Sequence, residues 1–249
     1  MSDLILALDK LDEQGKLDYG VLSLLTRCKD VDGFKITVAS LFDDWYREFW
    51  GFCSMMGSVY NKYYKVLLDL KLADVGVFGK EERWVGTNSE IVKSAAYHGI
   101  VTHITVHAFP GRYSVREAIE TAATCGAEVI LLTGMTHKGA DQFMCQPQYM
   151  DDVVLMGEEF NVGGYVAPGN DIDFLSRLRT KTNRDIWSPG FGRQVTLRGG
   201  ENINISEQIK RWRSIVESEI HDGNVIVGSY IINDDEPEER ISEILEILK

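Results

Sequence analysis

The sequence predicts a single (β/α)8 barrel that occupies residues 1–249. Eight short apolar runs alternate with eight longer amphipathic runs in strict strand–helix order, which favours parallel pairing of the strands. Eight such units in 249 residues match the usual size of one barrel. No Pro-, Gly- or Ser-rich linker divides the chain, so we expect one domain.

The individual elements follow from hydrophobic periodicity and from the turn residues that bound each run. The expected strands are 4–9, 33–38, 65–70, 102–107, 128–133, 163–167, 184–188 and 224–228. The expected helices lie near 17–29, 42–62, 88–98, 113–125, 139–160, 171–182, 206–220 and 237–248. A doubly wound open sheet is the alternative, but it usually carries a Gly-rich turn after its first strand, and "LALDKLDEQGKLD" has none.

Charge and composition narrow the range of partners. The 26 basic and 38 acidic residues give a net charge of −12, which disfavours a nucleic acid or an anionic membrane as a partner. No apolar run approaches the ~20 residues that a membrane span needs. The four cysteines are too widely spaced for a metal site or a C-x-x-C pair. Reduced thiols and a cytoplasmic location are therefore expected.

Charged residues interrupt each of the first three expected strands. They lie on the equivalent face of each strand. In "KVLLDLKLAD", Asp69 and Lys71 alternate with leucines, and Asp74 follows at the strand's end. Lys35 and Asp9 stand on the equivalent faces of the two preceding strands. Such side chains would point into the barrel near the end where the βα loops build active sites.

Buried charges of this kind must pair with one another, because desolvation of an isolated ion is costly. A purely structural ion network is one interpretation. The other is chemical: a substrate carboxylate placed beside Asp69 would be repelled, and loss of CO2 would leave a carbanion that Lys71 could stabilise and protonate. The acid–amine–acid pattern therefore suits decarboxylation without an organic electron sink.

Several motifs resemble the orotidine 5'-phosphate decarboxylase suprafamily of barrels. "DLKLAD" is its D-x-K-x-x-D motif. The similarity extends along the chain through "LILALD", "GFKI", "ITVHAFPGRYSV", "VILLTGMTHKGADQF" and "SPGFGRQ". The resemblance implies a cofactor-free, metal-free carboxy-lyase that converts orotidine monophosphate to UMP in pyrimidine biosynthesis.

The same resemblance implies roles for the charged residues. Lys71 resembles the proton donor, and Asp69 resembles the acid that faces the substrate carboxylate. Lys35 is implied as a further catalytic residue, and Asp9 as its orienting, substrate-binding partner. Asp74 resembles an acid that is contributed across a homodimer interface.

Further residues are implied in substrate binding. Thr87 resembles a threonine that reaches the ligand of the partner subunit. Thr136 stands where the family has a serine that reads the pyrimidine edge. Pro189 and Gln194 lie in "SPGFGRQ", and Gln194 resembles a glutamine that bridges pyrimidine and phosphate.

The phosphate site departs from the family pattern. The family usually reads V-G-R at the last strand, whereas this chain reads "VGS", with Gly228 followed by Ser229. If nothing replaces the bidentate arginine, phosphate binding is expected to be weaker by about 1.5–3 kcal/mol. Arg193 is our first candidate for a replacement, and the alternative is that it is an exposed loop arginine. Arg198 and the amides of Gly228 and Ser229 are further candidate donors.

Two other stretches raise alternatives. The insertion "FGKEERW" within 77–85 is expected to be a surface loop, an enlarged dimer edge or a lid, and its Lys80 or Arg83 could reach a phosphate. His103 and His107 share a strand face but lack a third zinc ligand.

The function has two alternatives. One is a divergent decarboxylase of another phosphorylated acid, such as a sugar phosphate. The sugar-phosphate members of the suprafamily carry a glutamate in place of Lys35 and use Mg2+, which an ammonium would repel. The other is a non-catalytic nucleotide-binding paralogue.

Overall fold

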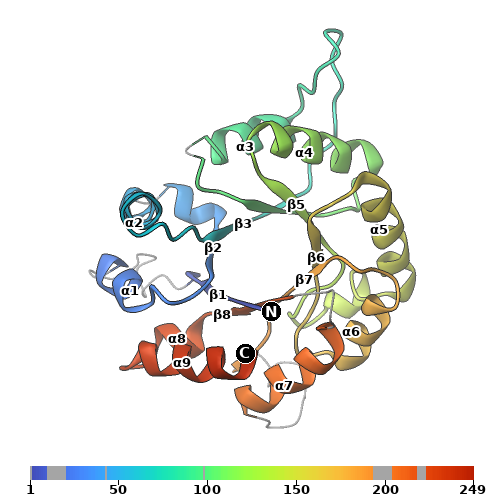
Figure 1. The fold of residues 1–249 in the computed structure, drawn as a ribbon. Coiled ribbons are helices and arrows are strands. Elements are labelled where there is room, and N and C mark those ends of the chain that lie inside the picture. The colour runs from blue at the N-terminus through green and yellow to red at the C-terminus, as the bar shows by residue number, and fades with distance from the viewer. Residues whose placement is uncertain (1, 10–20, 43, 98, 193–203, 218–222) are drawn as a thin grey trace.

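The structure is a computed structural model that describes all residues except 1, 10–20, 43, 98, 193–203 and 218–222. In this part of the chain, parallel strands pair in sequence order from β1 to β8, and β8 pairs with β1 to close the barrel. Helices surround the barrel, as Figure 1 shows. The predicted (β/α)8 architecture is confirmed.

The elements agree with the expected ones to within a few residues at most ends. The strands are β1 (Asp3–Ala7), β2 (Gly33–Thr37), β3 (Lys65–Leu72), β4 (His103–Val106), β5 (Glu128–Leu132), β6 (Gly164–Val166), β7 (Asp185–Ser188) and β8 (Gly223–Val227). The described helices are α1 (Val21–Arg27), α2 (Trp45–Tyr60), α3 (Thr87–Ala95), α4 (Arg112–Thr124), α5 (Pro147–Phe160), α6 (Ile172–Arg179), α7 (Ile205–Val216), α8 (Ser229–Ile232) and α9 (Pro237–Leu248), with 3-10 turns η1 (Val38–Phe42) and η2 (Ala140–Gln142).

Two expectations about the helices are corrected. The helix expected over 139–160 is divided into η2 and α5, because Pro147 occupies the first turn of α5, where its fixed φ and missing N–H favour a helix start. The short helix α8 was not predicted, since four residues are too few to show a helical period. None of the described helices is long and apolar enough to cross a membrane.

The strands are sandwiched between two apolar layers. Leu68 and Leu72 of β3 pack with the helices in the larger, outer cluster. Leu67 of the same strand belongs to a separate cluster inside the barrel, together with Ile130 and Ile226. The alternation predicted from sequence is confirmed, and it places the charged face of β3 toward the barrel interior.

Short polar side chains set several helix ends. The carboxylate of Asp171 accepts a hydrogen bond from the backbone three residues into α6, and Asn204 does the same for α7. Asn61 and Asn161 adopt left-handed φ values of 52° and 57° at the C-terminal ends of α2 and α5. These residues therefore mark where α6 and α7 begin and where α2 and α5 end.

Residues 77–85 form a hairpin arm that projects away from the barrel (Figure 1). Phe78 and Trp84 form an antiparallel bridge, and the amide of Val85 donates to the carbonyl of Val77 at 3.0 Å. Trp84 is buried and its Nε1 donates to Glu120 of α4 at 2.5 Å. The insertion is therefore a small two-stranded arm anchored on α4.

At the N-terminal end of the barrel, His103 is mostly buried and packs against Trp187, with ring centroids 4.6 Å apart. Burial, aided by the nearby ammonium of Lys65, lowers the pKa of His103 to about 4. Glu128 Oε2 lies 3.9 Å from Nε2, but this carboxylate is 66% exposed and its attraction is weak. The imidazole is therefore neutral at pH 7.

We expect the protein to lose stability as the pH falls from 6.5 toward 4. In that window the unfolded chain protonates His103 at its ordinary pKa near 6.5 while the folded chain does not, so acid favours unfolding. The loss should be about 3 kcal/mol between pH 7 and pH 4. Urea unfolding of wild type and His103→Gln at both pH values measures it, and an equal loss in both would contradict the assignment to His103.

Candidate active site

A cavity of about 430 Å3 opens at the carboxyl ends of the strands. Its floor is apolar and comes from four strands, with Leu67, Leu132, Val166 and Ile226 as the contributing residues. Its mouth is lined by the loops that follow the strands, which is where barrel enzymes place their catalytic groups. The volume suits a small ligand such as a nucleotide.

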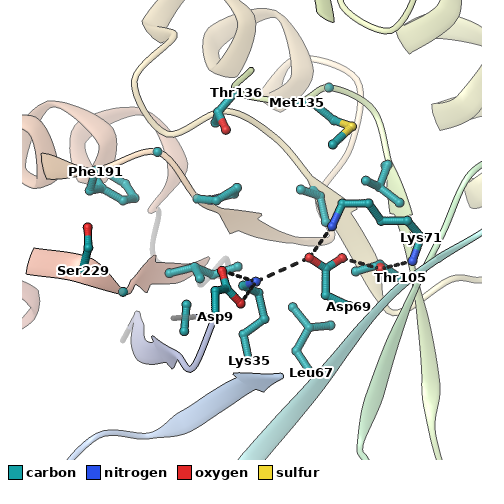
Figure 2. Close-up of a pocket in the computed structure, with 18 of the residues that line it drawn as sticks. Asp9, Lys35, Leu67, Asp69, Lys71, Thr105, Met135, Thr136, Phe191 and Ser229 are labelled. Atoms are coloured by element: carbon teal, nitrogen blue, oxygen red, sulfur yellow. Dashed lines mark hydrogen bonds and ion pairs between the residues drawn. The ribbon is translucent and has the colours of Figure 1, made fainter. Parts of the chain in front are cut away.

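Four charged side chains form a row across the cavity (Figure 2). Lys35 Nζ lies 2.5 and 2.7 Å from the two carboxylate oxygens of Asp9. The same ammonium lies 3.4 Å from Asp69 Oδ2, and Lys71 Nζ contacts that oxygen at 2.5 Å. The order Asp9–Lys35–Asp69–Lys71, which we call the charge row, alternates sign at every step, as the sequence predicted.

Asp69 is the buried centre of the charge row, with 12% of its side chain exposed. Burial alone would raise its pKa, but the ammonium groups of Lys35 and Lys71 outweigh burial and hold the pKa of Asp69 below its usual range. Asp69 is therefore ionised at neutral pH. Lys71 is 38% exposed and Lys35 only 9%, so Lys71 is the amine that can meet a ligand.

A β-bulge shapes β3 at this point. The segment from Leu68 to Leu72 lies opposite the shorter segment from Ile104 to Val106 of β4, and Lys71 has a left-handed φ of 48°. A non-glycine residue in this region costs on the order of 1 kcal/mol, and such residues cluster at functional sites. Asp69 and Lys71, two positions apart on this strand, both line the cavity.

Other lining residues were partly predicted. Thr136 and Pro189 line the cavity, as expected from the sequence. Met135, Phe191 and Asn233 also line it but were missed, because a methionine, a phenylalanine and an asparagine near strand ends carry no distinctive pattern.

The predicted phosphate end of the cavity is formed by Gly228 and Ser229, which both line it. Ser229 starts the short helix α8, with Gly228 in the capping position. Among the described lining residues the cations are Lys35 and Lys71, and both are paired with carboxylates. Within the described chain, the phosphate end therefore has no cation of its own.

The predicted candidates for the role of the missing arginine are Arg193, Arg198, Lys80 and Arg83. Arg193, Gln194 and Arg198 lie in 193–203, outside the described residues. Lys80 and Arg83 sit on the hairpin arm, and neither lines the cavity. The arm of this chain is thus a surface extension and does not cover its own cavity.

The two residues expected to serve a partner subunit lie outside the cavity. Asp74 follows β3 and is exposed, with its carboxylate accepting from the amide of Val75 at 2.7 Å. Its backbone carbonyl accepts a hydrogen bond from Asn88 at 2.8 Å. Thr87 is exposed at the first turn of α3. Neither side chain lines the cavity of its own chain.

The histidine pair shows no metal arrangement. His107 is buried against Phe109, with ring centroids 5.1 Å apart, while His103 packs on Trp187 at the other end of the barrel. In the described residues, no three His, Cys, Asp or Glu side chains lie close enough to hold a metal ion.

The closed barrel and the charge row at its carboxyl end define a barrel carboxy-lyase. The chain belongs to the Orotidine 5'-phosphate decarboxylase / HUMPS family, whose profile matches residues 2–244.

Known relatives and solved structures agree with this assignment. The chain is 31% identical to an orotidine 5'-phosphate decarboxylase of Methanosphaera stadtmanae, covering 100% of this chain and 98% of the relative. It is 30% identical to the Thermoplasma acidophilum enzyme of the same name over 78% of each chain. The structure of orotidine 5'-monophosphate decarboxylase from Methanocaldococcus jannaschii complexed with inhibitor BMP superimposes with a TM-score of 0.74 at 26% identity, covering 100% of this chain and 99% of that one.

Proposed function

We propose that this protein is an orotidine 5'-monophosphate decarboxylase that forms UMP and CO2 in pyrimidine biosynthesis, with no metal or organic cofactor. The observation that carries the proposal is Asp69, ionised and held between Lys35 and Lys71 at the mouth of an apolar cavity. Relatives that bear this enzyme name match the whole chain. We also propose that residues 1–249 act as one domain in the cytoplasm.

The first step uses repulsion. A substrate carboxylate on C6 of the pyrimidine would lie beside Asp69, and two like charges ~4 Å apart repel by about 4 kcal/mol at an effective dielectric near 20. Breaking the bond from C6 to the carboxylate carbon releases neutral CO2, so the negative charge moves from the carboxylate to C6. The electron pair of the broken bond stays on C6.

The second step uses Lys71. Its ammonium stabilises the negative charge that develops on C6 and then donates a proton to that carbon, which gives UMP. The neutral amine recovers its proton from water. Lys35, bound to Asp9 at 2.5 Å, keeps a second positive charge next to Asp69 and holds the carboxylate in place.

The remote end of the nucleotide supplies binding energy. Thr136 lines the cavity and its hydroxyl would read the pyrimidine edge. Gly190, Gly228 and Ser229 line the same cavity, and we propose that the ribose and phosphate lie against them. We propose Arg193 as the phosphate cation, with Gln194 bridging pyrimidine and phosphate. Such remote contacts matter because a reaction without an electron sink needs a rate enhancement on the order of 20 kcal/mol.

We propose a homodimer in which Asp74 and Thr87 reach the partner's cavity. Both are exposed and lie outside the cavity of their own chain, which is what a residue offered to a partner requires. In such a dimer, a site takes Lys71 from one chain and Asp74 from the other.

Mixing two inactive variants tests the shared site. Lys71→Ala and Asp74→Ala homodimers should each be inactive. After unfolding and refolding a 1:1 mixture, half of the dimers are mixed, and each mixed dimer has one intact site and one with both defects. Activity should recover to about a quarter of wild type. A mixture that stays inactive would rule out sharing of Asp74.

The function itself is tested with purified protein and orotidine monophosphate. UMP formation in the presence of a chelator supports the proposal. Activity on a sugar phosphate that requires Mg2+ would instead favour the divergent decarboxylase. The ammonium of Lys35 beside the cavity disfavours that outcome, because it repels a divalent cation.

The second candidate is a non-catalytic nucleotide-binding paralogue. The presence of Ser229 in place of an arginine favours it, because the described phosphate end then has no cation of its own. Titration with UMP separates the candidates. Tight UMP binding with no turnover of orotidine monophosphate would identify the paralogue, whereas turnover excludes it.

A further inference from the structure

Thr105 is a polar residue in the centre of β4, and 1% of its surface is exposed. It lines the cavity next to the charge row (Figure 2). Its neighbours Ile104 and Val106 belong to the outer apolar cluster, so Thr105 faces the barrel interior. A buried hydroxyl at this place needs partners, and it has two.

The two hydrogen bonds of Thr105 have a fixed direction. Its Oγ1 accepts from the backbone N–H of Lys71 at 2.9 Å, since an amide can only donate. The single hydroxyl proton is then left for Asp69 Oδ1, which lies 2.7 Å away and is ionised. One side chain thus connects the backbone of the proton donor to the carboxylate at the centre of the charge row.

The first bond supports the bulge in β3. At Lys71 the register between β3 and β4 shifts, and the backbone takes a left-handed φ of 48°. The amide of Lys71 donates to the Thr105 hydroxyl at 2.9 Å. The hydroxyl therefore gives an acceptor to the backbone at the strained residue of the bulge.

The second bond orients Asp69. Because Thr105 holds Oδ1, the other oxygen, Oδ2, is the one that contacts Lys35 at 3.4 Å and Lys71 at 2.5 Å. A hydrogen bond to the charged form of a buried carboxylate also favours ionisation. Loss of the hydroxyl would free Oδ1 inside the barrel and leave the amide of Lys71 without this acceptor.

We propose that Thr105 is a positioning residue of the reaction, which holds Asp69 and Lys71 in register through one hydroxyl group. This inference rests on the proposed function for its kinetic consequences. Its structural content does not, because the two hydrogen bonds exist whatever the substrate is.

Two variants separate the hydroxyl from the shape of the side chain. Thr105→Val keeps the size and the β-branch and removes both hydrogen bonds, whereas Thr105→Ser keeps the hydroxyl and loses a methyl group. We expect Thr105→Val to lower kcat by about 10- to 100-fold, with KM changed much less. Thr105→Ser should restore most of the lost turnover.

The pH dependence of kcat/KM distinguishes a positioning role from a purely structural one, because a purely structural role of Thr105 would leave it unchanged. Since Asp69 must be ionised, and the hydroxyl helps to keep it so, the acid limb of kcat/KM should move to higher pH in Thr105→Val and return in Thr105→Ser. Equal losses in both variants, or an unmoved acid limb in Thr105→Val, would overturn the proposal.

A measurement without substrate tests the proposal even if the wild-type protein does not turn over orotidine monophosphate. The carboxyl carbon of Asp69 can be titrated by NMR in 13C-labelled protein, with the signal assigned by its absence in Asp69→Asn. We expect Thr105→Val to raise the pKa of Asp69 relative to wild type. An unchanged titration would overturn the positioning role, while an inactive wild type would overturn only the proposed function.

Discussion

Lys71→Ala should lower turnover of orotidine monophosphate on the order of 10⁴-fold or more. The substitution removes both the proton donor and the cation that stabilises the carbanion, and each contribution is typically worth two or more orders of magnitude. The fold should survive, because Asp69 keeps its bonds to Lys35 and Thr105. Steady-state or single-turnover assays with comparison of melting temperatures measure both effects.

A surface lysine provides the matched control for this loss. Lys93 lies on α3, is 49% exposed and pairs only loosely with Glu90 at 3.4 Å. Lys93→Ala should therefore keep wild-type kinetics. A Lys71→Ala protein with kcat within tenfold of wild type would remove Lys71 as the donor and would redirect attention to the other amine of the charge row, Lys35.

Asp69→Asn should lower kcat by about 10³-fold and should also change which ligand the protein prefers. An amide has no charge to repel the substrate carboxylate. The variant should therefore bind orotidine monophosphate more tightly relative to UMP than the ionised Asp69 allows. Tighter substrate binding together with slower turnover is the combination expected of ground-state repulsion.

The binding part is best measured where no turnover occurs. We would compare Lys71→Ala with the Lys71→Ala/Asp69→Asn double variant, using calorimetric titration with both nucleotides. The preference for orotidine monophosphate over UMP should rise by about 10²- to 10³-fold in the double variant. Asp173→Asn, at an exposed position of α6, serves as the control carboxylate. An unchanged preference would show that Asp69 acts by positioning Lys71 and not by repulsion.

The fold and the charge row could be predicted because both depend on a period of two along the strands. Leucines on one face of β3 and charges on the other are visible in the sequence, and the structure places them in the outer layer and the cavity. Lys35 also helped to predict the charge row. Alternation along its strand placed it inside the barrel, and a lysine inside a barrel needs a carboxylate close by.

The bulge at Lys71 could not be predicted. Strict alternation of side chains is enough to place Asp69 and Lys71 on one face, so the residue pattern shows no irregularity there. The structure reaches the same placement through a register shift and a positive φ, which depend on the pairing of β3 with β4. Thr105 was missed because threonine is common in strands. Its role appears only when the amide of Lys71 and the carboxylate of Asp69 are seen on either side of its hydroxyl.

The most direct test of the charge row is a crystal structure of the protein bound to UMP. We expect the pyrimidine to lie on the apolar floor, with C6 within about 4 Å of Lys71 Nζ and the C6–H bond directed at Asp69. Asp9, Lys35, Asp69 and Lys71 should keep their alternating contacts. A base bound with C6 turned away from Lys71, or a charge row dispersed into solvent, would contradict decarboxylation at this site.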